Sequence, residues 1–202
     1  MKEKSELLKP SINDISKDFK LFDGNDLLFK DLISKSSNYF EYGCGDSTKY
    51  VYVHSRADVY SVDTSQQWVN KTKNSLTIKE NSLFIKWIDI GPLLDWGWPK
   101  NFNKSYNFIN FTDWFWKLNI ACDLVLIDAR FRVCCFFTSI KYAKIGTKII
   151  FDDYIDREHY HIVEETCNII EKHGRQVLFE VTEKSKNIIS DELIERFRKD
   201  PR

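Results

Sequence analysis

The sequence has no excess charge of either sign, no long apolar run and no signal-like start. Its 30 Lys and Arg residues balance 30 Asp and Glu residues, so the whole chain produces no field that would draw it to nucleic acid or an anionic membrane. The opening residues MKEKSELLKP contain no apolar core, and no stretch reaches the roughly 20 apolar residues of a membrane helix. These absences predict a cytoplasmic protein without a membrane partner, and they argue against a nucleic-acid partner.

Paired cysteine motifs are also missing. The five cysteines are odd in number, and none forms a Cys-x-x-Cys pair. This excludes the usual disulfide framework and the usual zinc motifs, and predicts reduced, buried thiols.

No internal repeat and no linker rich in Pro, Gly or Ser divides the chain. We predict a lead-in over residues 1–24 and a single domain over 25–202. Short apolar strand-like runs alternate with helical patterns, which predicts an α/β fold: a Rossmann-like three-layer sandwich with a mostly parallel central sheet and helices on both faces. Further helices are expected over 157–173 and 191–199, the last packing on its own sheet or on a second subunit of a homodimer.

The stretch FEYGCGDST (40–48) lies between a predicted strand and a predicted helix, the context of a glycine-rich cofactor turn. Gly43 would allow the tight turn, and Gly45 would let the backbone approach a ligand. Asp63 ends the next predicted strand, where an acid binds ribose hydroxyls. Thr48 stands where a dinucleotide fold has Gly or Ala, and Asp46 would repel a diphosphate. The pattern therefore favours a cofactor with a ribose and no diphosphate.

This combination resembles the Rossmann-like (class I) S-adenosylmethionine-dependent methyltransferases, over roughly residues 25–180. The match to their acid-x-Gly-x-Gly motif is Glu41-Tyr42-Gly43-Cys44-Gly45. The resemblance implies that the glycine turn lies beneath the cofactor, that Asp63 binds the ribose diol and that Asp89 meets the adenine amino group. The implied cofactor-binding residues are Glu41, Gly43, Gly45, Ser47, Asp63 and Asp89.

A second stretch, DLVLIDARFRVCCFF (123–137), looks like the DGRFRVAC signature of a small group of methyltransferase-like proteins. The stretches 90–99 (IGPLLDWGWP) and 152–160 (DDYIDREHY) look like further motifs of that group. Ala129 stands where the group has glycine. The likeness implies a reaction class rather than a substrate.

Acidic residues follow the predicted fourth and fifth strands, namely Asp128, Asp152 and Asp153. Carboxylates that converge in this way cannot all stay ionised without a cation or raised pKa values. They resemble the magnesium ligands of catechol O-methyltransferase, with Asp153 in place of its Asn, which implies Mg²⁺ at these three residues. Helix capping and general base catalysis are the alternatives.

Arg130 and Arg132 are two residues apart, so one faces the cleft if the segment is extended. They would either clamp a carboxylate or phosphate of the acceptor or form internal salt bridges to Asp128 or Asp152. His159 is a candidate base or else a surface residue. The candidate catalytic residues are Asp128, Asp152, Asp153, Arg130, Arg132 and His159.

Residues 91–118 are rich in aromatic side chains, among them four tryptophans. They are expected to form a lid or acceptor wall over the carboxyl ends of the strands. The alternative is a cover for the sheet or a dimer face.

The leading hypothesis is an S-adenosylmethionine-dependent methyltransferase acting on oxygen, less readily nitrogen, of a small polar acceptor such as a sugar or glycan precursor. The alternatives are a nucleic-acid methyltransferase, a non-catalytic binding or scaffold protein of the same fold, and a NAD-dependent oxidoreductase. Neutral charge and the absence of an Asn/Asp-Pro-Pro-Tyr/Phe motif argue against the first. The missing third glycine argues against the last.

Overall fold

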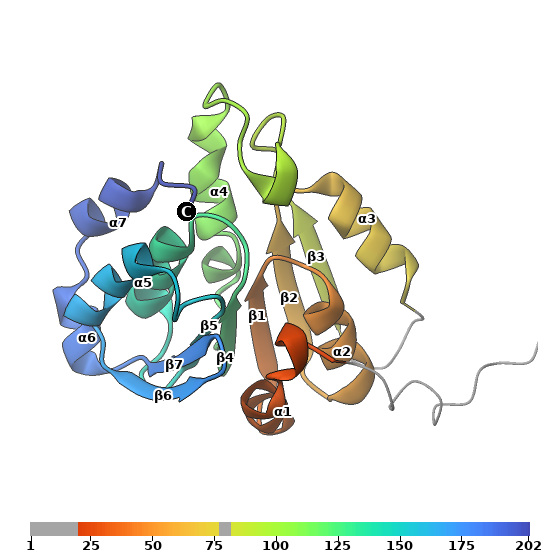
Figure 1. Cartoon of the computed structure of the whole chain (residues 1–202), viewed down its shortest axis with the longest axis horizontal. Coiled ribbons are helices and arrows are strands. Elements are labelled where there is room, and N and C mark those ends of the chain that lie inside the picture. Colours follow the sequence, from red (N-terminus) through yellow and green to blue (C-terminus); the bar gives the residue numbers. More distant parts are fainter. Residues whose placement is uncertain (1–19, 77–81) are drawn as a thin grey trace, which may run out of the picture.

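Seven strands form one sheet in a computed structural model that describes residues 20–76 and 82–202 (Figure 1). The sheet order is β3-β2-β1-β4-β5-β7-β6, with β1 to β5 parallel and β7 antiparallel to both β5 and β6. The strands are β1 (Asn38–Tyr42), β2 (Asp58–Asp63), β3 (Leu83–Trp87), β4 (Leu124–Ile127), β5 (Lys148–Phe151), β6 (Ile169–His173) and β7 (Gln176–Glu180). The mostly parallel α/β prediction is confirmed, with an antiparallel hairpin at one edge.

Helices cover both faces of this sheet because successive strand residues point to opposite sides (Figure 1). Tyr39 packs in one buried cluster with residues of α1 and α2, and Phe40 packs in another with residues of α4, α5 and α7. The α-helices are α1 (Leu27–Ser34), α2 (Asp46–His54), α3 (Gln66–Asn74), α4 (Phe108–Thr112), α5 (Arg132–Tyr142), α6 (Glu183–Ile188) and α7 (Asp191–Phe197). Within the described residues, 3₁₀ helices lie at Phe22–Gly24, Asp95–Gly97, Ser105–Asn107, Phe115–Leu118 and Glu158–Glu165.

The helix expected over 157–173 is wrong. A 3₁₀ helix occupies Glu158–Glu165, and Ile169–His173 is the edge strand β6, paired with β7. Gly174, with a φ of 57°, makes the turn between the two strands. Pairing with β7 satisfies the backbone of this stretch, and a tertiary contact of that kind overrides local helical patterning.

The predicted lead-in, residues 1–24, lies mostly outside the described residues. From residue 20 onward the chain is packed: Leu21 and Phe22 are buried with Phe29 of α1 and Tyr39 of β1. The five cysteines are all free and buried, as predicted. Across residues 20–76 and 82–202, no helix combines the length and the apolar character needed to cross a membrane.

Candidate functional site

A cavity of about 760 Å³ opens at the carboxyl ends of the central strands. Its size falls within the range of about 300–1,000 Å³ typical of small-molecule sites. Strand order reverses between β1 and β4, and such a switch point is where open α/β sheets bind ligands. The glycine turn and several charged side chains line this cavity, among them Gly43, Gly45, Asp63, Asp128, Arg130 and Asp153.

The turn after β1 requires glycine at its first position. Gly43 has a φ of 97°, and a Cβ there would lie 2.5 Å from the Asp128 carbonyl oxygen. Its N–H donates to the Val62 carbonyl at 2.8 Å, which ties the turn to β2. At Gly45 an added Cβ would meet nothing within 4 Å, since this residue faces the open cavity. The backbone of the turn is therefore open to the cavity at Gly45.

Glu41 lies beneath this turn and does not line the cavity. Its carboxylate is fully buried and accepts hydrogen bonds from hydroxyls of β1, β2 and the start of α2, with Thr48 Oγ1 at 2.5 Å and Ser61 Oγ at 2.9 Å. Ser47, which does line the cavity, also donates to Glu41. Burial raises the pKa of Glu41, and these hydroxyls oppose the shift. Glu41 is thus a positioning residue rather than the direct cofactor contact that the motif implied.

Asp63 joins the glycine turn to the start of α3. Its carboxylate accepts hydrogen bonds from the Cys44 N–H at 2.9 Å and the Ser65 N–H at 2.6 Å. Burial raises the pKa of Asp63, and these two N–H groups oppose the shift. The side chain lines the cavity beside the glycine turn, where the sequence placed a ribose contact.

Asp89 is not brought to the cavity, so its expected adenine contact has no counterpart in this arrangement. Its carboxylate pairs with Lys104 Nζ at 2.5 Å and accepts from the Gly91 N–H at 2.9 Å. A hydrogen bond from Lys104, the largest cause, lowers the pKa of Asp89. The aspartate therefore anchors the start of the 91–118 segment.

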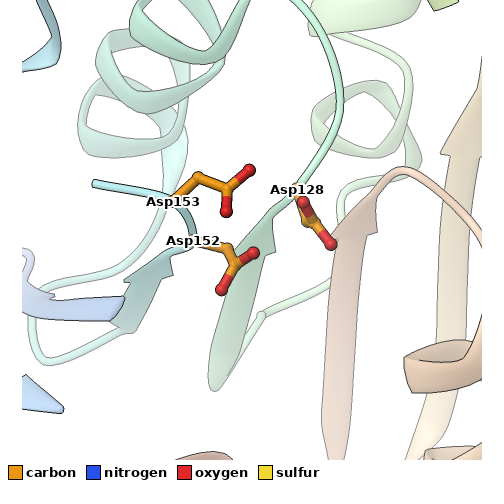
Figure 2. Close-up of side chains that lie close together, drawn as sticks. All are labelled: Asp128, Asp152 and Asp153. Carbon is orange, nitrogen blue, oxygen red and sulfur yellow. The ribbon is translucent and has the colours of Figure 1, made fainter. Parts of the chain in front are cut away.

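Three carboxylates gather at the ends of β4 and β5, as predicted (Figure 2). Each of Asp128, Asp152 and Asp153 offers an oxygen within 4.8 Å of the others. Asp152 is fully buried, whereas the side chains of Asp128 and Asp153 are 32% and 21% exposed. Asp153 has a φ of 54°, a left-handed conformation that aspartate tolerates better than most residues.

Guanidinium groups already neutralise these carboxylates. Arg132 Nη2 lies 3.0 Å from Asp128, and Arg157 Nη2 lies 2.7 Å from Asp153. The Arg175 Nη2 atom lies 2.7 Å from Asp152. The internal salt bridge proposed for Arg132 is thus present, and its side chain is almost fully buried.

The donor set fits Mg²⁺ poorly. A magnesium ion needs carboxylate oxygens free to coordinate it in octahedral geometry. Here a cation would have to displace the guanidinium partners of Asp128 and Asp153 and would lie close to Arg132. The structure therefore brings the three predicted ligands together without favouring a metal among them.

Asp128 has a raised pKa. Desolvation of its partly exposed carboxylate in the cavity, the largest cause, raises the pKa to about 7, Asp152 and Asp153 add to the shift, and Arg132 opposes it. A carboxylate with a pKa near neutrality is matched to proton transfer at neutral pH.

His159, the other candidate base, lies outside the cavity. It is exposed and packs against the Tyr160 ring, with ring centroids 4.2 Å apart. Nothing in its position supports a catalytic role.

The aromatic segment 91–118 divides into two parts. Trp96 and Trp98 line the cavity, and in Figure 1 this green segment lies above the ends of β2 and β3. The later part is core: Phe108 and Phe115 are fully buried, and Trp116 Nε1 donates to the Tyr42 hydroxyl at 3.0 Å. The first part of the segment thus borders the cavity and the later part covers the sheet, and a role as lid or acceptor wall stays a prediction.

Arg175 is a site residue that sequence reasoning missed. It follows Gly174 at the β6–β7 turn and reaches both Asp152 and Asp153, which stand more than 20 residues earlier. The helix wrongly expected over 157–173 hid this hairpin, so no sequence signal connected Arg175 with the cavity.

Comparison with known proteins gives a structural likeness only. No family model and no curated protein matches the sequence. A methyltransferase-like protein from Silicibacter pomeroyi has a TM-score of 0.75 and 25% identity, over 97% of this chain and 98% of that chain. Magnesium protoporphyrin IX methyltransferase from Synechocystis, with bound S-adenosylmethionine, has a TM-score of 0.52 and 12% identity over 79% of each chain. An S-adenosylmethionine-dependent O-methyltransferase from Thermotoga maritima has a TM-score of 0.51 and 11% identity, over 85% of this chain and 71% of that chain.

The two more distant likenesses show the fold alone. Taken with the first, they identify the architecture as that of the class I S-adenosylmethionine-dependent methyltransferases.

Proposed function

We propose that the protein transfers a methyl group from S-adenosylmethionine to an oxygen of a small polar acceptor, such as a sugar or glycan precursor. One observation carries this proposal: a single cavity joins the glycine turn and Asp63 to Asp128, whose pKa is raised to about 7. The likeness of residues 128–135 to the DGRFRVAC signature is consistent with the same reaction class.

In this proposal the cofactor lies along the glycine turn. The open space beside Gly45 admits a ligand against the backbone, and the Asp63 carboxylate offers an acceptor for ribose hydroxyls. Ser47 and Glu41 hold the turn from below. Asp89 has no part in this arrangement because Lys104 engages it away from the cavity.

When bound, S-adenosylmethionine supplies a methyl group on a sulfonium. An acceptor oxygen would take this methyl group from the sulfonium sulfur and would have to give up its own proton. Asp128 takes that proton, since its pKa near 7 lets it be ionised before the step and protonated after it. Arg132, at 3.0 Å, keeps the Asp128 carboxylate oriented.

We further propose that the reaction needs no metal. Mg²⁺ would serve in such a site to stabilise the acceptor oxyanion and to compensate the carboxylates. Arg132, Arg157 and Arg175 already provide the compensation, and Asp128 provides a base.

The test is calorimetric titration with S-adenosylhomocysteine of the wild type, Asp63→Ala and the control Asp31→Ala. Asp31 is an exposed aspartate on α1 paired with Lys35, so its loss removes the same charge far from the cavity. We expect micromolar binding by the wild type and the control, and a loss of about tenfold or more in Asp63→Ala. Absence of binding by the folded wild type would overturn the proposed function.

A further inference from the structure

Arg130 differs from the other arginines that line the cavity. Arg132, Arg157 and Arg175 each lie within ion-pair distance of an aspartate. Over residues 20–76 and 82–202, no carboxylate lies within ion-pair distance of the Arg130 guanidinium. A partly buried cation without an ion-pair partner carries an electrostatic cost, which an anionic ligand would reduce.

The contact that Arg130 does make leaves its hydrogen-bond donors available. Its guanidinium carbon lies 5.3 Å from the centroid of the Trp98 ring, within the usual range of a cation–π contact. Within residues 20–76 and 82–202, no hydrogen bond from the Arg130 side chain is found, and a ring contact does not satisfy the five N–H donors of a guanidinium. The indole therefore holds the group in place while a fork of donors remains for a carboxylate or phosphate.

The surroundings of Arg130 also favour an anion. Partial burial, followed by the nearby charges of Arg132 and Arg157, lowers the pKa of Arg130, while Tyr160 and Asp128 oppose the shift. Gly97 approaches it closely, because a Cβ on Gly97 would lie 3.7 Å from Arg130 Cγ. The neighbouring Trp96 is 89% exposed and lines the same cavity. The Arg130 guanidinium thus lies against the Trp98 ring in the same cavity as Asp128.

We propose that Arg130 and Trp98 form a subsite for a carboxylate or phosphate group of the acceptor, so that the methylated substrate is an anionic small molecule. This inference rests on the proposed function for the identity of the acceptor. The subsite lies in the same cavity as Asp128, so an acceptor held by its anionic group could present a hydroxyl to that base.

The test uses inorganic phosphate and acetate as probes of the protein loaded with S-adenosylhomocysteine. Binding is followed through the Trp98 indole N–H resonance, assigned with Trp98→Phe, against sodium chloride of equal ionic strength. The variants are Arg130→Gln, Arg130→Lys and the control Arg196→Gln. Arg196 is an exposed arginine over the Phe197 ring at 5.6 Å, outside the cavity, so it matches Arg130 in charge and stacking.

We expect millimolar binding of both anions to the wild type and to Arg196→Gln. Binding should weaken by about tenfold or more in Arg130→Gln, as for the loss of a charge-assisted hydrogen bond. Arg130→Lys should restore part of it, since it keeps the charge without the fork. Affinity for S-adenosylhomocysteine should stay within about twofold of wild type in all three variants.

Three results would overturn the inference. These are no anion binding by the loaded wild type at millimolar concentration, equal anion binding by Arg130→Gln, or a tenfold loss of S-adenosylhomocysteine affinity in Arg130→Gln. The last would assign Arg130 to the carboxylate of the cofactor. If S-adenosylhomocysteine does not bind at all, the proposed function fails separately, and titration of the unloaded protein with phosphate still tests the subsite.

Discussion

The two glycines of the first turn offer matched substitutions with different expected effects. Gly43→Ala places a methyl group 2.5 Å from the Asp128 carbonyl oxygen, closer than such atoms approach in proteins, at a residue whose φ is 97°. A non-glycine residue in a sparsely populated conformation costs about 1–3 kcal/mol, and the clash adds to it. We expect the free energy of unfolding to fall by about 2–4 kcal/mol.

Gly45→Ala should instead weaken ligand binding and leave the stability of the protein nearly unchanged. Its Cβ would meet nothing within 4 Å, and its backbone φ of 179° is extended. The free energy of unfolding should therefore stay within about 1 kcal/mol of wild type. The added methyl group projects into the cavity, where we expect it to weaken S-adenosylhomocysteine binding by about tenfold or more, which corresponds to a steric penalty of about 1.4 kcal/mol.

Urea unfolding and calorimetry on the same preparations separate the two effects. The slope of unfolding against urea should be equal in all three proteins, so that midpoints compare stability directly. The reasoning is refuted if Gly43→Ala is as stable as the wild type, or if Gly45→Ala loses as much stability as Gly43→Ala. If folded Gly45→Ala binds S-adenosylhomocysteine with the affinity of the wild type, the glycine turn is not part of the cofactor site.

Further tests address charge, support and metal. Desolvation raises the pKa of Asp128 to about 7 in the folded state, whereas an aspartate in the unfolded chain has a pKa of about 4. Between these pH values the folded protein keeps a proton on Asp128 that the unfolded chain has lost. The contribution of Asp128 to the free energy of unfolding therefore falls as pH rises from about 4 to about 7. Asp128→Asn should flatten that slope in urea unfolding, and equal slopes would contradict the shift. Glu41→Gln should cost about 1–3 kcal/mol because an amide N–H would face hydroxyl donors; a smaller loss than in Ser61→Ala would argue against its supporting role. Addition of Mg²⁺ or EDTA should leave the thermal midpoint unchanged, and a rise of several degrees with Mg²⁺ would contradict the metal-free proposal.

The sheet and the main cavity residues could be predicted from the sequence because their signals are local. A buried parallel strand is a short apolar run, and the acids that end such runs meet at one edge of the sheet. Asp63, Asp128 and Asp153 were found on this basis, and all three line the cavity. Gly43 was predicted for the turn, and the structure adds its reason, the close approach of the Asp128 carbonyl.

The errors concern properties that depend on distant partners. Asp89 pairs with Lys104, 15 residues later, and does not line the cavity. The strand at Ile169–His173 exists because β7 pairs with it, and its own residues are mostly exposed. Glu41 belongs to a motif associated with the cofactor, but three-dimensional packing turns its carboxylate toward hydroxyls under the turn. None of these outcomes can be read from spacing alone.

The pairing of charges around the cavity bears on the kind of acceptor. Binding a nucleic-acid backbone requires several unengaged cations, one for each phosphate contacted. In the part of the chain that the structure describes, three of the four arginines lining the cavity pair with aspartates, which leaves Arg130 and the exposed Lys20 as the cavity's cations without an ion-pair partner. One guanidinium stacked on Trp98 suits a single anionic group. The pairing of Arg132, Arg157 and Arg175 with carboxylates also compensates their negative charge without a metal, as the proposed metal-free reaction requires.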